Sequence, residues 1–380
     1  MQAWRQTTRW SMRALSRQKL DAESSRQLVQ DASHRLQGQA YFLDQLQEDL
    51  KENDEVMPNG IIKASNNSVS SNLLDWKGHL EREKEEQRAL HQADIILRNL
   101  HVLHRDTVQL TQHLLQSENI WSSFTNAHQS TLAATMEQIR SRHATTLETV
   151  ADLVLLLRDY RDLPHAALTS LLRGRLSVQL LCDHYVGLQK GRQNGGVSVN
   201  CPLQPVLEEA VTEAKHLCEA HYQESPEIIL PKDYPAPLTL IRPWLHHALV
   251  EMLKNSMVAS MEISEKPPPI EIEVKEIDGG FVSIHIHDYG SGFDGDPFTF
   301  ASSPDKWDRL DVQQSYATVR SPLSSLGVGV PSSLWLLQHF GGNLELSNRD
   351  QRGCTATLVL PLDDDLPEYL PTMHSTMEEG

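Results

Sequence analysis

The sequence predicts an α+β protein of two domains, an N-terminal all-helical bundle and a C-terminal sandwich of helices and strands. Through most of residues 73–189 apolar residues recur every three to four positions, which is typical of helices packed side by side. From residue 270 onward, short segments alternate apolar and polar residues with a period of two, as strands do. A chain of 380 residues can build two domains with separate cores. We therefore place the domains at 21–190 and 200–365, joined by the glycine-containing linker "KGRQNGGVSVN".

Composition excludes several functional classes. The hydrophobic fraction of 39% with 22% charged residues is ordinary for a globular protein. The net charge of −17 argues against a nucleic-acid binder, because contacts to phosphates need a basic surface. The apolar runs are too short to span a bilayer, so we expect no membrane span. The four cysteines form no CxxC pair, and we expect free thiols.

Residues 1–20, "MQAWRQTTRWSMRALSRQKL", have a composition of their own. Arginines recur every four residues with apolar residues between them, and the first acidic residue is Asp21. This acid-free, amphipathic pattern is typical of a mitochondrial transit peptide, and a disordered basic tail is the alternative. In either case we expect the segment to stay outside the fold.

The helical domain is predicted in four parts. Residues 22–48 and 73–129 have helical spacing, and the polar segment 51–72, with the turn pair Asn59-Gly60, is predicted as a loop or disordered insertion. Helices at 130–158 and 164–189 follow, separated by "DYRDLP". The simplest arrangement is an antiparallel bundle of the four-helix type.

The second half alternates helices with strands. "PIEIEVKEI" and "FVSIHIHDYG" flank Asp278-Gly279-Gly280, which predicts a β-hairpin, and "GNLELSN" with "CTATLVLPL" predicts a second strand pair. Helices are expected at 203–222, 240–260 and 331–340. This mixture predicts an α+β sandwich, followed by an acidic tail at 366–380.

One nonamer, "HALVEMLKN" at 247–255, raises the question of a site. His247, Glu251 and Asn255 are four residues apart and form one stripe of a helix, while Leu245 and Leu249 lie on the other side. Taken alone, a solvated polar face is the favoured interpretation.

Three downstream motifs change that balance. In "HDYGSGF", Asp288 ends a strand and can accept a hydrogen bond from an exocyclic amine, although a lone DxGxG also occurs in ordinary turns. In "SSLGVGVP", Gly327 and Gly329 open a helix whose N–H groups could bind phosphate, and a simple helix cap is equally favoured. In "RGCTATLVL", Gly353 and Thr355 enter the last strand.

The order of the motifs is more specific than any one of them. A helix with ExxxN, then DxGxG, a long loop, GxG opening a helix and finally GxT resembles the GHKL (histidine-kinase-like) ATP-binding fold. That resemblance implies that Asp288 binds adenine and Asn255 binds Mg-ATP.

A narrower resemblance covers residues 130–362. "HALVEMLKNSMVAS" is similar to the HxxxExxKN helix of the mitochondrial kinases that act on 2-oxoacid dehydrogenases, the pyruvate and branched-chain dehydrogenase kinases. Segments 139–147, 174–186 and 199–228 are also similar to that family, and "SYATV" at 315–319 stands where its lid has a Y-S-T segment. The chain departs from the family at Ser325 (usually glycine), at Val258 (arginine), at Thr169-Ser170-Leu171 (a D-R-F run) and in lacking a terminal D-W pair.

The resemblance implies a protein serine kinase of the mitochondrial matrix that phosphorylates and inactivates the E1 alpha subunit of a 2-oxoacid dehydrogenase complex, first of all pyruvate dehydrogenase. Its implied partners are that subunit, the lipoyl domain of the E2 component and a second copy of the chain in a homodimer. Glu251 would be the general base, tuned by His247, and Asn255 would bind Mg²⁺. Lys254 would either neutralise phosphate charge or be solvated. The other residues implied in ATP binding are Asp288, Gly290, Gly292, Ala317, Thr318, Ser325, Leu326, Gly327, Val328, Gly329, Val330 and Thr355.

Other interpretations stay open. A regulator that binds ATP without phosphorylating the complex is favoured by Ser325 and Val258, while a histidine sensor kinase lacks a convincing His-Glu phosphoacceptor pair here. A chaperone or mismatch-repair ATPase would place the ATP domain first. "HRD" at 104–106 lacks the asparagine of a protein-kinase catalytic loop, and "HIH" at 285–287 has no third metal ligand. We expect structural roles for His143 and Arg175.

Overall fold

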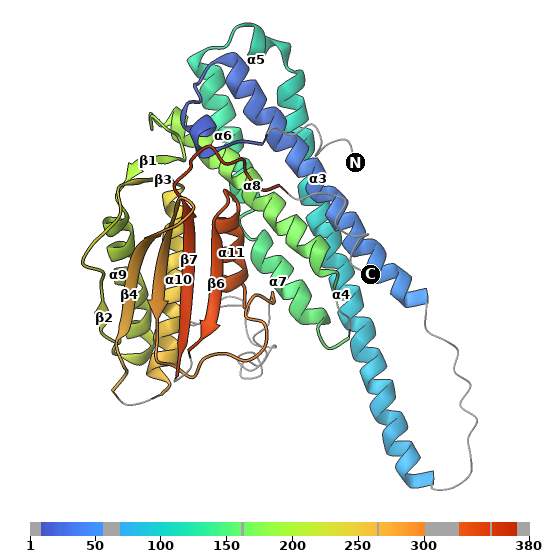
Figure 1. The fold of residues 1–380 in the computed structure, drawn as a ribbon. Coiled ribbons are helices and arrows are strands. Elements are labelled where there is room, and N and C mark those ends of the chain that lie inside the picture. The colour runs from blue at the N-terminus through green and yellow to red at the C-terminus, as the bar shows by residue number, and fades with distance from the viewer. Residues whose placement is uncertain are drawn as a thin grey trace.

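The structure is a computed structural model, and it describes residues 9–55, 69–160, 163–263, 266–300, 327–349 and 352–370. Its N-terminal half is a helical bundle and its C-terminal half a sheet covered by helices, as Figure 1 shows. The predicted α+β fold class is therefore confirmed. All four cysteines are free. No helix within the described ranges is long and apolar enough to cross a membrane.

The bundle consists of four long helical segments. α3 (Ala22–Glu55) packs against α4 (Val69–Gln116) and α8 (His165–Gln189), and α6 (Asn126–Arg142) packs against α8. α7 (Thr146–Leu157) lies on α4, and the short α5 (Glu118–Ser122) connects α4 to α6. α3 and α4 extend into the segment 51–72 from both sides, so the predicted loop is shorter than expected; residues 56–68 lie outside the described ranges.

The helix predicted at 130–158 is two helices. The chain turns at His143–Thr145, where Arg175 of α8 donates from Nε to the carbonyl of His143 at 3.0 Å and from Nη2 to that of Ala144 at 3.2 Å. These carbonyls would otherwise bond within a continuous helix, and the guanidinium satisfies them outside it. Arg175 and His143, the residue that ends α6, thus have the structural role we expected.

Two segments near the ends of the chain, residues 9–17 and 362–370, pack onto the fold, which corrects two predictions. Residues 9–17, here called the N-terminal strap, bury Trp10, Met12 and Leu15 and include the short helix α2 (Met12–Ser16). Residues 362–370, the C-terminal strap, bury Glu368 and Leu370, so the acidic tail predicted at 366–380 is not free at its start. The two straps pair antiparallel at Ser11 and Pro367. The expectation that residues 1–20 stay outside the fold is wrong for residues 9–20, because apolar side chains in the basic segment find a partner surface.

The C-terminal domain is a five-stranded sheet with helices on one face. The strand order is β2 (Ile228–Ile229), β4 (Ile270–Ile277), β5 (Phe281–His287), β7 (Cys354–Pro361) and β6 (Asn343–Asn348), antiparallel except for β2 with β4. β1 (Ser198–Cys201) and β3 (Leu238–Leu240) form a separate pair. The β4–β5 hairpin turns at Gly279 and Gly280, both at positive φ, as predicted.

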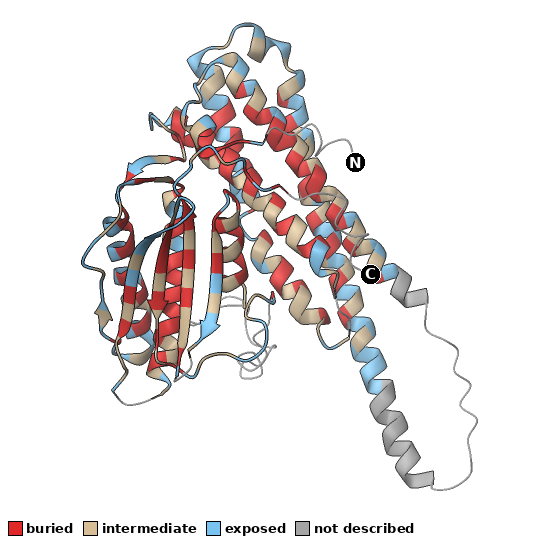
Figure 2. Ribbon diagram, viewed as in Figure 1, coloured by how far each residue is buried: buried red, intermediate tan, exposed pale blue. Residues whose placement is uncertain are grey.

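Three helices cover this sheet and one of them meets the bundle. α9 (Leu203–Tyr222) packs on α10 (Arg242–Met261), and α10 lies on β4, β5 and α11 (Gly329–Gln338). Figure 2 shows buried residues along the strands and along the facing sides of the bundle helices. Trp335 of α11 joins the apolar cluster of α3, α4, α7 and α8, stacked on Phe300 at 5.9 Å. α11 therefore lies between the sheet and the bundle.

Candidate functional site

The predicted polar stripe of α10 is only partly exposed. Glu251 and Lys254 are buried, with 9% and 7% of their surface exposed, and Lys254 Nζ donates to Glu251 Oε1 at 2.8 Å. Asn255, the next residue, is exposed. A buried carboxylate on an ordinary helix face would be costly, because desolvation penalises the charge unless it is paired. The solvated-face interpretation therefore does not describe Glu251 and Lys254.

His247 lies one turn before Glu251 and is kept neutral. Burial lowers the pKa of its imidazole, against an opposing effect of the Glu251 charge. Its Nε2 is 3.4 Å from Ser332 Oγ, and Ser332 donates its own hydroxyl hydrogen to the carbonyl of Gly329 at 3.0 Å. Since that hydrogen is used, Ser332 accepts from His247 Nε2–H, which leaves Nδ1 as the unprotonated nitrogen.

The N-terminus of α11 lies directly on the acid. A Cβ atom built on Gly329 would collide with Glu251 Oε2, so a larger residue there would displace the carboxylate. Gly327, two residues earlier, has a φ of +71°, which only glycine adopts readily. Val328 is the N-cap residue of α11, and Val330 packs on the core of the C-terminal domain. The predicted glycine motif thus brings the start of a helix, with its free N–H groups, next to Glu251.

Asp288 is a buried and fixed carboxylate at the end of β5. Its Oδ1 accepts from the N–H of Gly290 at 2.8 Å and from the N–H of Cys354 at 3.1 Å, and the Ser256 hydroxyl also bonds the carboxyl. Burial raises the pKa of Asp288, although these donors act to lower it. The carboxyl group is thereby oriented before any ligand binds.

The glycines around Asp288 allow the chain segments to approach closely. A Cβ on Gly290 would lie 2.5 Å from the Cβ of Ala259 in α10. Gly292 has a φ of +78° and lies against Asn348, whose amide bonds the N–H and the carbonyl of Phe293. Gly353, with a φ of +95°, leaves no room for a side chain beside the carbonyl of Asp288. The DxGxG loop and the last strand interlock through glycine.

Thr355 does not turn its side chain to Asp288. Its Oγ1 is 2.8 Å from His287 Nδ1, on the sheet face opposite to the core residue Ala356. On the last strand it is Cys354, a residue that we did not predict, that contacts the Asp288 carboxyl, through its N–H. The alternation of faces along a strand could have indicated that the side chain of Thr355 points away from Asp288. Thr355 pairs with His287, and the neighbours His287 and Asp288 point to opposite sides. Ser256, next to Asn255, also bonds the Asp288 carboxyl and was not predicted as a site residue.

Four predicted ATP-binding residues cannot be placed. Ala317, Thr318, Ser325 and Leu326 lie outside the described residues, and the roles expected of them stay predictions.

The histidines of the motifs "HRD" (104–106) and "HIH" (285–287) contact other side chains or the backbone of the fold. His104 of "HRD" is fully buried on α4, with Nε2 2.8 Å from the side chain of Gln39 and Nδ1 2.8 Å from the carbonyl of Leu100. His285 and His287 stack with ring centroids 5.9 Å apart on β5. Within the described ranges, no group of three or more histidine, cysteine or acidic side chains could hold a metal ion.

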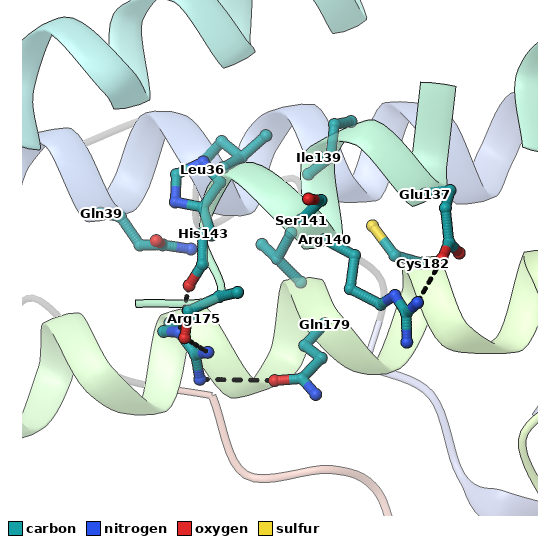
Figure 3. A pocket seen from close by; sticks show the side chains of 12 residues that line it. Leu36, Gln39, Glu137, Ile139, Arg140, Ser141, His143, Arg175, Gln179 and Cys182 are labelled. Atoms are coloured by element: carbon teal, nitrogen blue, oxygen red, sulfur yellow. Dashed lines mark hydrogen bonds and ion pairs between the residues drawn. The ribbon is translucent and has the colours of Figure 1, made fainter. Parts of the chain in front are cut away.

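A cavity of about 450 Å³ lies in the bundle, away from α10 and α11. Figure 3 shows it between α3, α6 and α8, with the guanidinium groups of Arg140 and Arg175 on its wall. Both are already engaged, Arg140 by Glu137 and Arg175 by the end of α6 and by Gln179. Cys182 faces Met136, with the two sulfur atoms 3.6 Å apart, and burial raises the pKa of its thiol.

Comparison with known proteins adds independent findings. Residues 241–364 match the family of histidine kinase-, DNA gyrase B-, and HSP90-like ATPases. The chain is 26% identical over 274 residues to the mitochondrial pyruvate dehydrogenase (acetyl-transferring) kinase isozyme 4 of Homo sapiens, a match that covers 64% of each chain. It is 27% identical over 249 residues to the mitochondrial pyruvate dehydrogenase kinase of Schizosaccharomyces pombe, covering 59% of this chain and 57% of that one. The kinase of Drosophila melanogaster is 25% identical over 282 residues, 64% of this chain and 65% of the relative. Each of these matches spans less than two thirds of the relative's length.

Proposed function

We propose that this chain, which carries a GHKL ATPase domain and is a relative of the mitochondrial 2-oxoacid dehydrogenase kinases, phosphorylates a serine of a 2-oxoacid dehydrogenase complex with ATP. The observation that carries the proposal is the buried Glu251, paired with Lys254 beneath the N-terminus of α11. A carboxylate, a cation and the N–H groups at a helix start are brought together in one place. Phosphoryl transfer needs mainly such positioning and charge neutralisation.

In this proposal Glu251 is the general base. It accepts the proton of the substrate serine hydroxyl while the serine oxygen bonds the γ-phosphorus and the bond to the ADP leaving oxygen breaks. Lys254 compensates the negative charge of the buried carboxylate. Neutral His247 orients the site through Ser332 and takes up no proton of its own.

The residues around Asp288 fit an adenine ring. The Asp288 carboxyl is an acceptor fixed by backbone donors, and glycines at positions 290, 292 and 353 let the neighbouring segments pack closely enough to hold it. The exposed Asn255 side chain offers an amide oxygen, the type of ligand that Mg²⁺ prefers beside substrate phosphates. When bound, the metal would neutralise phosphate charge. Gly327 and Gly329, with Ala317, Thr318 and Ser325, complete the set proposed for the triphosphate.

The finer assignments belong to the same proposal. The substrate is the E1 alpha subunit, with pyruvate dehydrogenase as the first candidate, since the relatives are named for that enzyme. The lipoyl domain of the E2 component and a second copy of the chain are the proposed partners, and the mitochondrial matrix is the proposed compartment.

The decisive experiment measures transfer of labelled phosphate from ATP and Mg²⁺ to purified pyruvate and branched-chain dehydrogenase complexes. Wild type is compared with Glu251→Gln and with Glu262→Gln, a matched change of the exposed glutamate that ends α10. We expect acid-stable serine phosphate on one complex, a loss of about 10²-fold or more in Glu251→Gln, and no change in Glu262→Gln.

ATP binding is measured in all three proteins by calorimetry. If Glu251→Gln still binds ATP, its loss of phosphate transfer is due to the missing base and not to a loss of nucleotide binding. ATP binding by wild type without transfer to either complex would favour a non-catalytic regulator, and wild type without ATP binding would contradict the proposal.

A further inference from the structure

A buried carboxylate joins both straps to the bundle and to α11. Glu368 of the C-terminal strap has a side chain with no exposed surface. Its Oε1 accepts from the N–H of Trp10 at 2.9 Å, and its Oε2 accepts from Arg35 Nη1 at 3.0 Å and from His339 Nε2 at 2.9 Å. Arg35 Nη2 bonds Oε1 as well. One carboxylate therefore connects four segments that are distant in the sequence.

Arg35 anchors this group in the bundle. Its guanidinium, fully buried on α3, also donates to the carbonyl of Ser177 in α8 at 3.1 Å. Burial acts to raise the pKa of Glu368, but the Arg35 charge and the His339 hydrogen bond outweigh it and bring that pKa to about 2. The carboxylate is therefore charged at every physiological pH.

The C-terminal strap holds the end of α11 at several points. His339 is the C-cap residue of α11, and its carbonyl accepts from the N–H of Tyr369 at 2.7 Å. Leu366 packs against Gly341, where a Cβ atom would lie 2.9 Å from its Cδ1. Arg173 of α8 bonds Gln338 and stacks over the ring of Tyr369 at 4.6 Å. In Figure 1 the dark red strap runs from β7 across α8, beside the end of α11.

The opposite end of the same helix lies on Glu251. α11 has ten residues, a rigid rod of about 15 Å, with His339 after its last turn and Gly329 at its first. Gly329 and Ser332 contact Glu251 and His247, so a shift of the rod changes the space over the base and the direction of the helix N–H groups. Contacts at the C-terminal end of α11 thereby determine geometry at the site.

We propose that Glu368 and His339 are positioning residues: the C-terminal strap holds α11 against the bundle so that its N-terminus lies correctly over the nucleotide site. Only the effect on ATP rests on the proposed function; the effect on α11 does not. Stability alone does not explain a charged group here, because well-packed apolar residues often replace buried ion pairs without loss. A link among four segments instead specifies one arrangement of the two domains.

The test compares His339→Leu with His339→Gln, in the full chain. Glutamine can offer its Nε2 donor to Glu368 as the imidazole does, whereas leucine cannot. Leu132→Ala opens a cavity in α6, in an apolar cluster that includes Trp10 of the N-terminal strap but no residue of α11, and it leaves Glu368 and His339 intact. It serves as a control that lowers global stability. Hydrogen exchange is followed at residues 329–338, and ATP affinity, KM and kcat are measured under folding conditions.

We expect hydrogen exchange in α11 to be about tenfold faster in His339→Leu than in Leu132→Ala. The dissociation constant and KM for ATP should also rise about tenfold, with kcat little changed. Both factors correspond to one lost hydrogen bond to a charged group. In His339→Gln, both the exchange rate of α11 and the affinity for ATP should return to near the wild-type values. The proposal is overturned if α11 exchanges no faster in His339→Leu than in Leu132→Ala, or if folded His339→Gln behaves like His339→Leu. Should wild type bind no ATP, the proposed function fails, and hydrogen exchange still decides the role of the strap.

Discussion

Asp288 shows how single residues in this site acquire their role from the backbone around them. Two N–H donors, from Gly290 and Cys354, fix one carboxyl oxygen, and glycine at positions 290 and 353 lets those donors come close. The carboxyl is oriented by the fold itself. A ligand amine can then be bound without the entropic cost of ordering the side chain.

Asp288→Asn tests this directly. The asparagine oxygen can still accept from Gly290 and Cys354, so we expect a fold of nearly unchanged thermal stability. Its amide group would face the adenine amine with a donor in place of an acceptor, and ATP affinity should fall about tenfold or more. Calorimetric titration with ATP measures this, with Asp294→Asn, an exposed residue of the following loop, as the control. Equal affinity in Asp288→Asn and wild type would contradict the assignment.

Among the elements, the N-terminal strap combines a composition typical of a transit peptide with packing onto the fold. Its spacing of arginine and apolar residues is that of a transit peptide, yet Trp10, Met12 and Leu15 are buried in the fold. Trp10 Nε1 donates to Asp31 at 3.0 Å, and Arg13 forms ion pairs with Asp363, Asp364 and Asp365 of the C-terminal strap. Those pairs are partly exposed, so burial of the apolar side chains supplies most of the stabilisation.

Removal of residues 1–20 should therefore destabilise the protein. Three buried apolar side chains contribute about 1.5–3 kcal/mol each, so we expect a loss of about 5 kcal/mol in the free energy of unfolding. Urea unfolding of the shortened and full chains measures it, and Trp10→Phe, which keeps the burial and loses the indole donor, should lose far less. A shortened chain as stable as the full one would mean that the segment is dispensable to the fold, as a cleaved transit peptide must be.

At the scale of the whole molecule, stability should depend on pH through buried histidines. Burial lowers the pKa of His104 to about 4, of His143 to about 3 and of His184 to about 4, all in the bundle. The unfolded chain binds these protons near pH 6.5, before the folded chain does, so stability is full above pH 6.5 and is lost as pH falls towards 4. Glu368, with a pKa of about 2, adds stability that is lost between about pH 4.5 and 2.

The free energy of unfolding should thus decline below pH 6.5, before most carboxylates titrate, by about 1.4 kcal/mol per pH unit for each such histidine. His184 accepts from the N–H of Gly196 at Nδ1, 3.2 Å away, and the oxygen of His184→Asn can accept the same bond without titrating. Urea unfolding between pH 7 and 5 measures this. In His184→Asn the free energy of unfolding should fall less steeply with decreasing pH, by the contribution of one histidine. An unchanged slope would contradict a buried neutral His184.

The sequence by itself determined the elements and the order of the site motifs. Helical and strand periods are local, so the bundle helices, the β4–β5 hairpin and the succession of ExxxN, DxGxG, GxG and the final glycine could be read along the chain. Only the tertiary structure decided which polar residues are buried. The polar stripe of the sequence includes Glu251, but its burial depends on contact with α11, and the break after α6 depends on Arg175 of another helix.

Glu368 and Trp10 were assigned to free ends because a segment's own composition does not reveal the surface that will bind it. The physical reason is common to these cases. Periodicity is set by neighbours in the chain, whereas the burial of Glu251, the break after α6 and the packing of the two straps depend on partners tens or hundreds of residues away.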